Sequence, residues 1–371
     1  MRIKVIEVSS DTNIGGAGKC LLTLLENFDY NKFEVKVVLP KNSLLKPHID
    51  KLRIPVIEVD GIADRSFDFK AVKTLKKIFN VEKPDIVHTH ASMSARIAAK
   101  QSGAKVIYTR HSVFPPSKKI SKGIGKVING IINNHYADSI IAVAEAAKDN
   151  LMDTGIDEKK INVVLNGVDG LMPVSSDEKR VIKDRFDLPD GYKAVAIVAR
   201  LEDIKGHDYF IEAADKILRE GYKVRFYIAG TGSYEQHLKE KVRKLNRQEQ
   251  IIFTGFISDV DKLMSITDIQ VNASYGTEAT SLALLEGMSL GIPAVVSDFG
   301  GNPGVIKNEK NGFVVPKRNS RELADKIQCL LDNEQLYQEL SENSLKIFAQ
   351  TFTAKAMTKQ TEKIYLESVT G

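Results

Sequence analysis

Short apolar segments alternate with helical segments along both halves of the 371-residue chain. In the first half, strands are predicted at residues 3–8, 35–39, 56–59, 86–88, 106–108 and 140–143, and helices at 18–27 and 69–79. The alternation begins again in the second half, with strands predicted at 194–198, 224–228, 251–253, 269–271 and 294–297. Because alternating strands and helices build parallel sheets covered on both faces, we predict an α/β fold with two such sheets.

Composition indicates the class of protein. A chain of this length exceeds one ordinary domain, and its hydrophobic content of 43% supports two full cores. Residues 173–178 contain Pro, Ser and acidic residues and are predicted to be a linker. The first residues have a strand pattern rather than that of a signal peptide, and no apolar run is long enough to span a membrane.

The cysteine content bears on the cellular compartment of the protein, and the net charge bears on whether it binds nucleic acid. Cys20 and Cys329 are too few for a disulfide framework, which fits a reducing cytoplasm. The net charge is +5, and no basic helix interleaved with aromatic residues is evident. We therefore expect a cytoplasmic protein that does not bind nucleic acid.

Residues 273–304 carry the clearest chemical signal. Glu278 comes just before a predicted helix start, where Thr280 and Ser281 are good N-caps, and Glu286 follows inside the helix. Free amides and the helix dipole at such a start favour an anion, while the carboxylates suit hydroxyl groups. The segment therefore suits a polyhydroxylated ligand with a phosphate; the alternative is a capped helix with solvated acids.

A pair of cations follows the first strand of the second half. Arg200 and Lys205 lie close together after it, and such a pair can neutralise a diphosphate. The alternative is two ordinary surface charges. Gly230 and Gly232 follow the next strand, but without a third glycine they do not make a dinucleotide fingerprint.

Gly15 and Gly16 follow the first strand of the chain. Glycines there permit close backbone approach and leave amides available at a helix start, which makes a phosphate cradle. A Walker A loop is excluded, because Asn13 and Cys20 stand where it needs glycine and Ser or Thr. A tight structural turn is the alternative.

Three histidines, His88, His90 and His111, each follow an apolar strand. Open α/β sheets place ligand groups at the carboxyl ends of their strands. The spacing does not supply the converging ligands that a metal site needs, so we predict no metal. A structural role is the alternative for each of them.

Residues 115–137 combine lysines with apolar residues at helical spacing. The apolar residues fall on one side and the lysines gather near the amino-terminal end: Lys118, Lys119, Lys122 and Lys126 with Ile120, Ile124, Val127, Ile128, Ile131 and Ile132. A core-facing helix with a solvated basic end fits this pattern, and so does a peripheral membrane contact. Both interpretations stay open here.

Residues 273–304 closely resemble the E-x7-E nucleotide-sugar motif of glycosyltransferase family 4, the retaining glycosyltransferases with the GT-B fold. Glu278 and Glu286 fall on the two motif glutamates, and Asn-Gly-Phe-Val-Val-Pro at residues 311–316 is also similar to that family. One departure concerns the three residues after the first glutamate, where the family usually has Gly-Phe-Gly. Here they are Ala279-Thr280-Ser281, so a β-carbon enters a crowded position that bears on the identity of the donor sugar.

The resemblance implies two Rossmann-like domains that face each other across a cleft. Residues 1–170, with a crossover helix at 352–371, would bind the acceptor, and residues 171–351 would bind the nucleotide sugar. No Asp-x-Asp metal motif is present, and no cofactor is implied. Positive charge on the leaving group would come from Arg200, Lys205 and helix amides.

The resemblance also implies the site residues. His111 is similar to the histidine that faces the donor sugar, with His90 as second choice. Catalytic roles fall on His111, Glu278, Arg200 and Lys205. Donor-binding roles fall on Gly15, Gly16, Arg200, Lys205, Gly230, Gly232, Phe256, Glu278, Ala279, Thr280, Ser281, Leu282 and Glu286.

The expected activity is transfer of a hexose-type sugar from a UDP-sugar, with retention of configuration. The expected acceptor is lipid-linked or an envelope polysaccharide, reached at the inner face of the membrane. Two alternatives remain: a nucleotide-sugar 2-epimerase of GT-B fold, which needs no acceptor, and a non-catalytic protein that binds nucleotide sugars.

Overall fold

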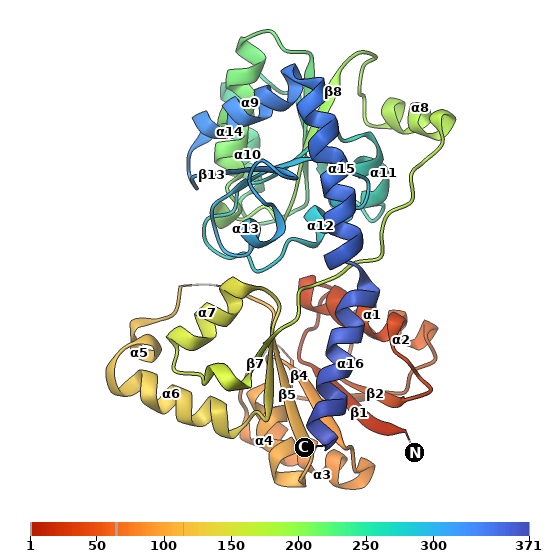
Figure 1. Cartoon of the computed structure of the whole chain (residues 1–371), viewed down its shortest axis with the longest axis vertical. Coiled ribbons are helices and arrows are strands. Elements are labelled where there is room, and N and C mark those ends of the chain that lie inside the picture. Colours follow the sequence, from red (N-terminus) through yellow and green to blue (C-terminus); the bar gives the residue numbers. More distant parts are fainter. Residues whose placement is uncertain (1, 64–65, 114, 371) are drawn as a thin grey trace. The chain divides into compact units, whose positions relative to one another are not determined.

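The computed structural model describes residues 2–63, 66–113 and 115–370. The chain divides into two compact units, one made of Met1–Val168 with Thr353–Gly371 and the other of Asp169–Phe352 (Figure 1). Met1 and Gly371, which the predicted domain boundaries include, lie outside the described residues. No helix in the described part of the chain is both long and apolar enough to cross a membrane.

The first unit is built on a parallel sheet with the strand order β3-β2-β1-β4-β5-β6-β7. Its strands are β1 (Ile3–Ser9), β2 (Phe33–Pro40), β3 (Val56–Val59), β4 (Ile86–His90), β5 (Lys105–Arg110), β6 (Ser139–Ala142) and β7 (Ile161–Val163). The predicted strands of this half are thereby confirmed, with boundaries that differ by a few residues.

Helices cover both faces of this sheet. They are α1 (Gly16–Asn27), α2 (Lys46–Lys51), α3 (Phe69–Glu82), α4 (Met93–Ser102), α5 (Lys118–Ser121), α6 (Gly123–His135), α7 (Glu145–Asp153) and α16 (Ala354–Thr370). Alternate residues of β1 serve opposite cores: Val5 packs with residues of α1 and α16, whereas Ile6 and Val8 pack with residues of α3 and α4. Glu7 therefore points to the same side as Val5, towards α16.

The core-facing interpretation of residues 115–137 is wrong. The segment forms two helices, α5 and α6, separated at Lys122, whose backbone is extended. Within α5 no residue is buried, and within α6 only Gly130 is buried. The apolar residues of α6 are therefore at the surface of the first unit.

The second unit holds a parallel sheet with the order β10-β9-β8-β11-β12-β13. Its strands are β8 (Lys193–Val198), β9 (Val224–Ala229), β10 (Ile251–Gly255), β11 (Ile269–Asn272), β12 (Ala294–Ser297) and β13 (Gly312–Val315). Its helices are α8 (Ser176–Arg185), α9 (His207–Arg219), α10 (Glu235–Lys244), α11 (Val260–Ile266), α12 (Leu282–Met288), α13 (Asn302–Val305), α14 (Ser320–Asp332) and α15 (Glu334–Thr351).

The predicted linker at 173–178 is only half correct, because α8 begins inside it. The Ser175 hydroxyl accepts a hydrogen bond from the Glu178 amide, and the Glu178 carboxylate accepts one from the Ser175 amide. This capping box satisfies amides that would otherwise be unpaired at the helix start. The same Ser and acidic residues that suggested a linker therefore start a helix.

Both sheets reverse their strand order beside a central strand, between β1 and β4 in the first unit and between β8 and β11 in the second. In open α/β sheets, ligands bind beyond the carboxyl ends of the strands at such a point. The segments that follow these strands carry Gly15 and Gly16, Lys205 and Glu278, and His90 is the last residue of β4. The topology thus gathers predicted site residues at one edge of each sheet.

Candidate functional site

Lys205 and Glu278 form a nearly buried ion pair in the second unit. Lys205 follows β8 and Glu278 follows β11, and Lys205 Nζ donates to Glu278 Oε2 at 3.0 Å and to the carbonyl of Thr277 at 2.9 Å. The two side chains are only 11% and 10% exposed. A buried charge needs a partner of opposite sign, so each side chain stabilises the other at this edge of the sheet.

Two polar residues that the sequence analysis missed complete the surroundings of Glu278. The Asn272 amide and the Ser274 hydroxyl both donate to Glu278 Oε2 at 3.2 Å. The backbone amide of Gly301 donates to the Glu278 carbonyl at 3.1 Å. Polar residues directly after the predicted strand 269–271 were the available signal.

A glycine brings the lysine loop and the glutamate loop together. Gly206, next to Lys205, has a φ of +75°, and a β-carbon there would lie 2.0 Å from the carbonyl oxygen of Ala273. Because no side chain fits in that space, only glycine lets the segment after β8 approach the segment after β11 so closely. The ion pair depends on this approach.

Arg200 does not join the ion pair. Its side chain is 69% exposed and forms a salt bridge with Glu202, with 2.6 Å between Nη1 and Oε1. The structure therefore brings Lys205 together with Glu278, while Arg200 stays at the surface after β8, paired with Glu202 through Nη1.

Helix α12 begins just after the first motif glutamate. Ser281 is its N-cap, and the Ser281 hydroxyl accepts a hydrogen bond from the Leu284 amide, as predicted. Ala279 is buried, whereas Thr280 and Leu282 are half-buried. Glu286 lies within the helix, half-buried, while Glu278 lies outside it. The two glutamates therefore occupy different surroundings.

The glycines after β9 have a packing reason. A β-carbon at Gly230 would lie 2.1 Å from the carbonyl oxygen of Ala199, and one at Gly232 would lie 2.2 Å from that of Leu201. These glycines thus hold the segment after β9 against the segment that carries Arg200. Phe256, after β10, is 77% exposed.

Gly15 and Gly16, unlike Gly230 and Gly232, are not in close contact with another backbone segment. Gly15 is the N-cap of α1 and Gly16 its first residue, and a β-carbon at either position would meet nothing within 4 Å. Packing within the first unit therefore does not account for these glycines. Open space at the start of a helix of this length is compatible with the predicted phosphate cradle.

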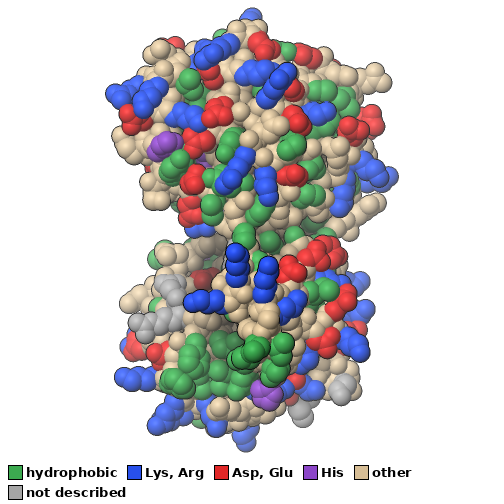
Figure 2. All heavy atoms as spheres, turned by 90° about the vertical axis from the view of Figure 1, so that its left-hand side faces the viewer, with side chains coloured by type: hydrophobic (Ala, Val, Ile, Leu, Met, Phe, Trp, Pro, Cys, Tyr) green, Lys and Arg blue, Asp and Glu red, His purple; other side chains and the backbone are tan. Residues whose placement is uncertain are grey.

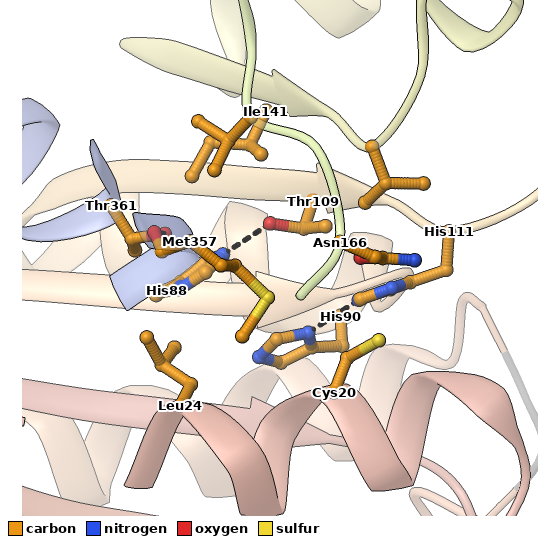
Figure 3. A pocket seen from close by; sticks show the side chains of 12 residues that line it. Cys20, Leu24, His88, His90, Thr109, His111, Ile141, Asn166, Met357 and Thr361 are labelled. Atoms are coloured by element: carbon orange, nitrogen blue, oxygen red, sulfur yellow. Dashed lines mark hydrogen bonds between the residues drawn. The ribbon is translucent and has the colours of Figure 1, made fainter. Parts of the chain in front are cut away.

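The three histidines form one cluster in the first unit (Figure 3). His90 Nδ1 lies 2.7 Å from His111 Nε2, and His90 Nε2 lies 3.0 Å from Glu7 Oε2. His88 lies 2.6 Å from the Tyr365 hydroxyl through Nδ1 and 2.6 Å from the Thr109 hydroxyl through Nε2. These side chains adjoin a cavity of about 30 Å³, lined also by Cys20, Leu24, Asn166 and Met357.

Glu7 is the centre of this cluster, and the sequence analysis did not select it. It is fully buried, and the Tyr365 hydroxyl donates to its Oε1 at 2.6 Å. An acidic residue in the predicted strand 3–8, which is apolar apart from Lys4 and Glu7, was the available signal. The candidate residues His90 and His111 are thereby connected to a buried carboxylate.

Burial and hydrogen bonding shift the pKa values of the cluster. Burial alone would raise the pKa of Glu7, but the interactions with His88 and His90 outweigh it and hold that pKa well below its usual range. Burial, and then the neighbouring His90 and His88, lower the pKa of His111 well below its ordinary value. We therefore describe Glu7 as ionised and His111 as neutral near pH 7.

The same cluster contains the atoms that a metal would need. One ligand atom each from Glu7, His88 and His90 lie within 4.8 Å of one another. These atoms already bond to each other and to Tyr365, so hydrogen bonding accounts for their proximity. The absence of a metal stays a prediction.

Comparisons with known proteins agree with this architecture. A family model described as Glycosyl transferases group 1 matches residues 178–347, and one described as Glycosyltransferase Family 4 matches residues 14–170. The chain is 27% identical to the UDP-Gal:alpha-D-GlcNAc-diphosphoundecaprenol alpha-1,3-galactosyltransferase of Escherichia coli, over 85% of this chain and 84% of that protein.

Solved structures show the same fold. A glycosyltransferase from Rickettsia africae matches with a TM-score of 0.85 and 22% identity over 99% of both chains. HepE from Anabaena, solved in complex with UDP-glucose, matches with a TM-score of 0.85 and 19% identity over 99% of this chain and 100% of that chain. The two family matches together cover every strand of the two sheets except β1, and they include the Lys205–Glu278 pair. The chain therefore belongs to glycosyltransferase family 4, with the GT-B fold.

Proposed function

We propose that the protein transfers a hexose-type sugar from a UDP-sugar to a lipid-linked or envelope polysaccharide acceptor, with retention of configuration, at the inner face of a membrane. The observation that carries the proposal is the Lys205–Glu278 pair at the reversal point of the second sheet. The Escherichia coli relative supports the donor and acceptor classes, since its name specifies UDP-Gal and a diphosphoundecaprenol acceptor. The HepE complex with UDP-glucose supports the donor class further.

The reaction exchanges one bond at the anomeric carbon of the sugar. The bond from that carbon to the diphosphate oxygen breaks, and its electron pair leaves with UDP. The acceptor oxygen bonds to the same carbon, and its proton passes to the departing phosphate. Charge develops on the diphosphate, so cations placed beside it stabilise the transition state.

The residues of the second unit can share this work. Lys205 would donate to a diphosphate oxygen, and the exposed guanidinium of Arg200 would bind the other phosphate through its fork. Glu278 would accept hydrogen bonds from sugar hydroxyls, and Glu286 from the ribose. The amides of Gly15 and Gly16 in the first unit remain a predicted phosphate cradle.

The test is to incubate the full chain with UDP-glucose, UDP-galactose or UDP-N-acetylglucosamine and a polyprenyl-diphosphate-linked sugar, and to analyse the products. A new glycosidic bond with the anomeric configuration of the donor supports the proposal. An epimerised nucleotide sugar formed without acceptor would establish the epimerase instead, and binding without any product would establish a binding protein.

Lys205→Met tests the role of the nearly buried lysine. Its matched control is Lys244→Met, on the exposed surface of α10. We expect product formation to fall about a hundredfold in the first variant and to stay unchanged in the second. Equal activity in both variants would argue against a role for Lys205 in the transfer.

A further inference from the structure

Helix α6 is attached to the first unit by its polar side. The Asn129 amide donates to the carbonyl of Thr154 at 2.7 Å. The buried guanidinium of Arg96 donates to the side-chain oxygen of Asn133 at 2.9 Å and to the Asn133 carbonyl at 2.8 Å. A β-carbon at Gly130 would lie 2.2 Å from the Gly155 carbonyl oxygen, so the helix backbone itself lies against that turn. The inward face of α6 is therefore built from asparagines and a glycine.

The apolar side of the same helix faces outward. Ile124 is 78% exposed and Ile131 is 64% exposed, and Val127, Ile128 and Ile132 are exposed as well. A surface helix of a soluble domain normally has the opposite arrangement, with its apolar stripe against the core. Figure 2 views the side of the first unit that carries α5 and α6, and it shows hydrophobic side chains gathered in one patch with basic side chains nearby. A continuous patch of this kind marks an interaction surface.

Lysines lie next to this apolar face. Helix α5 carries Lys118 and Lys119, and Lys122 lies at the junction; all three are exposed. A β-carbon at Gly125 would lie 1.9 Å from the Lys119 carbonyl oxygen, so glycine allows α5 to pack directly on α6. Lys126 is half-buried within α6, and residues 115–137 contain no acidic residue. The surface combines exposed aliphatic side chains with lysines, and its own segment contributes no acidic side chain.

We infer that α5 and α6 form a membrane-contacting surface that binds a bilayer rich in anionic lipids. The isoleucines and valine of α6 would enter the boundary between headgroups and acyl chains, and the lysines would bind the anionic headgroups. The inference rests on the proposed function, because a lipid-linked acceptor lies at a membrane, and it names the surface that meets that membrane. A second copy of the chain fits less well, because the same lysines would then face each other.

The test is sedimentation of the full chain with lipid vesicles, without any sugar donor. We expect the protein to sediment at low salt with vesicles of phosphatidylcholine mixed with phosphatidylglycerol, and to stay in solution with phosphatidylcholine alone. Binding to the anionic vesicles should exceed binding to the neutral ones on the order of a hundredfold and weaken as salt rises. A protein that stays in solution with anionic vesicles at low salt would overturn the inference.

Two sets of variants separate charge from apolar contact. Changing Lys118, Lys119, Lys122 and Lys126 to Gln should abolish the preference for anionic vesicles. The matched control changes the four lysines of α3 in the same unit, Lys70, Lys73, Lys76 and Lys77, to Gln and should bind like the wild type. An equal loss in both variants would show that only overall charge matters and would overturn the assignment to α5 and α6.

Ile124→Ser with Ile131→Ser tests the apolar face. Because both side chains are exposed, the melting temperature should not fall, while vesicle binding should fall at least tenfold at low salt. A concentration-dependent dimer that these two changes abolish, with vesicle binding unaffected, would overturn the inference in favour of a second copy. Failure of sugar transfer would refute the proposed function but would leave vesicle binding intact.

Discussion

His90 lies between Glu7 and His111, and its bond to Glu7, with 3.0 Å between Nε2 and Oε2, sets where the protons of both histidines lie. An ionised carboxylate only accepts hydrogen bonds, so His90 must carry its proton on Nε2. With one proton on each ring, Nδ1 of His90 accepts, and the donor is Nε2–H of His111, 2.7 Å away. His111 is left with a bare Nδ1, an acceptor that has no partner among the described residues.

The proton positions along the hydrogen bonds from Glu7 through His90 to His111 can be measured directly. We predict that two-dimensional NMR of the protein labelled with ¹⁵N-histidine shows His111 with its proton on Nε2. In Glu7→Gln, the side-chain amide can donate to Nε2 of His90, so that Nδ1–H of His90 then donates to Nε2 of His111. Part of the His111 population should therefore carry its proton on Nδ1. His135, exposed at the end of α6, provides the control and should not change. Finding the wild-type proton on Nδ1 of His111 would contradict this assignment.

The buried carboxylate should also contribute to acid sensitivity. The pKa of Glu7 in the folded protein lies below its usual range, so its ionised form stabilises the fold above the unfolded-state pKa of 4.5. This contribution is lost as pH falls towards the folded-state pKa, and each unit of difference is worth about 1.4 kcal/mol. Urea unfolding between about pH 3 and pH 7 should therefore show a steeper loss in wild type than in Glu7→Gln. If the free energy of unfolding fell equally with pH in both proteins, Glu7 would not contribute to the acid sensitivity.

The two cations after β8 should differ in what their loss does to the fold. Arg200→Ala removes an exposed side chain, so activity should fall about a hundredfold without loss of thermal stability. Lys205→Ala should reduce activity similarly and also lower stability, because it leaves Glu278 nearly buried without a cation. Steady-state kinetics would measure the loss of activity in both variants, and thermal melts would show whether only Lys205→Ala loses stability. Activity of Arg200→Ala within threefold of wild type would exclude Arg200 from the site.

Replacing Glu278 and replacing Glu286 should have different effects on the affinity for UDP without a sugar. Glu286→Ala should weaken UDP binding, because Glu286 is expected to hold the ribose. Glu278→Gln should leave UDP binding nearly unchanged and reduce turnover, because Glu278 is expected to hold the sugar, which UDP lacks. Calorimetric titration with UDP makes the comparison. An equal loss of affinity in both variants would show that the roles are not divided in this way.

The sequence predicts the fold well because its signals are local. Short apolar runs identify buried parallel strands. Position also offered two N-caps for α12, Thr280 and Ser281, of which Ser281 has that role in the structure. The loop residues Lys205 and Glu278 were selected individually. Their direct contact was not foreseen, because it depends on the close approach that Gly206 permits between two segments distant in sequence.

Two features escaped sequence analysis for different physical reasons. Glu7 occupies one position of a mainly apolar strand, and its partners His90 and Tyr365 come from elements that only the folded chain brings together. The orientation of α6 escaped because helical periodicity shows which residues share a face but not which face meets the core. Only the contacts of Arg96 and Gly130 reveal that the asparagine side is inside.

The bond between Tyr365 and Glu7 joins residues that are 358 positions apart. During synthesis, the sheet of the first unit is complete in sequence long before the helix that supplies this hydroxyl group exists. In a nascent first unit this carboxylate therefore lacks both one of its donors and the helix that packs on its side of the sheet, while the whole of Asp169–Phe352 is made and can fold. The first unit, although it is translated first, reaches its final form last.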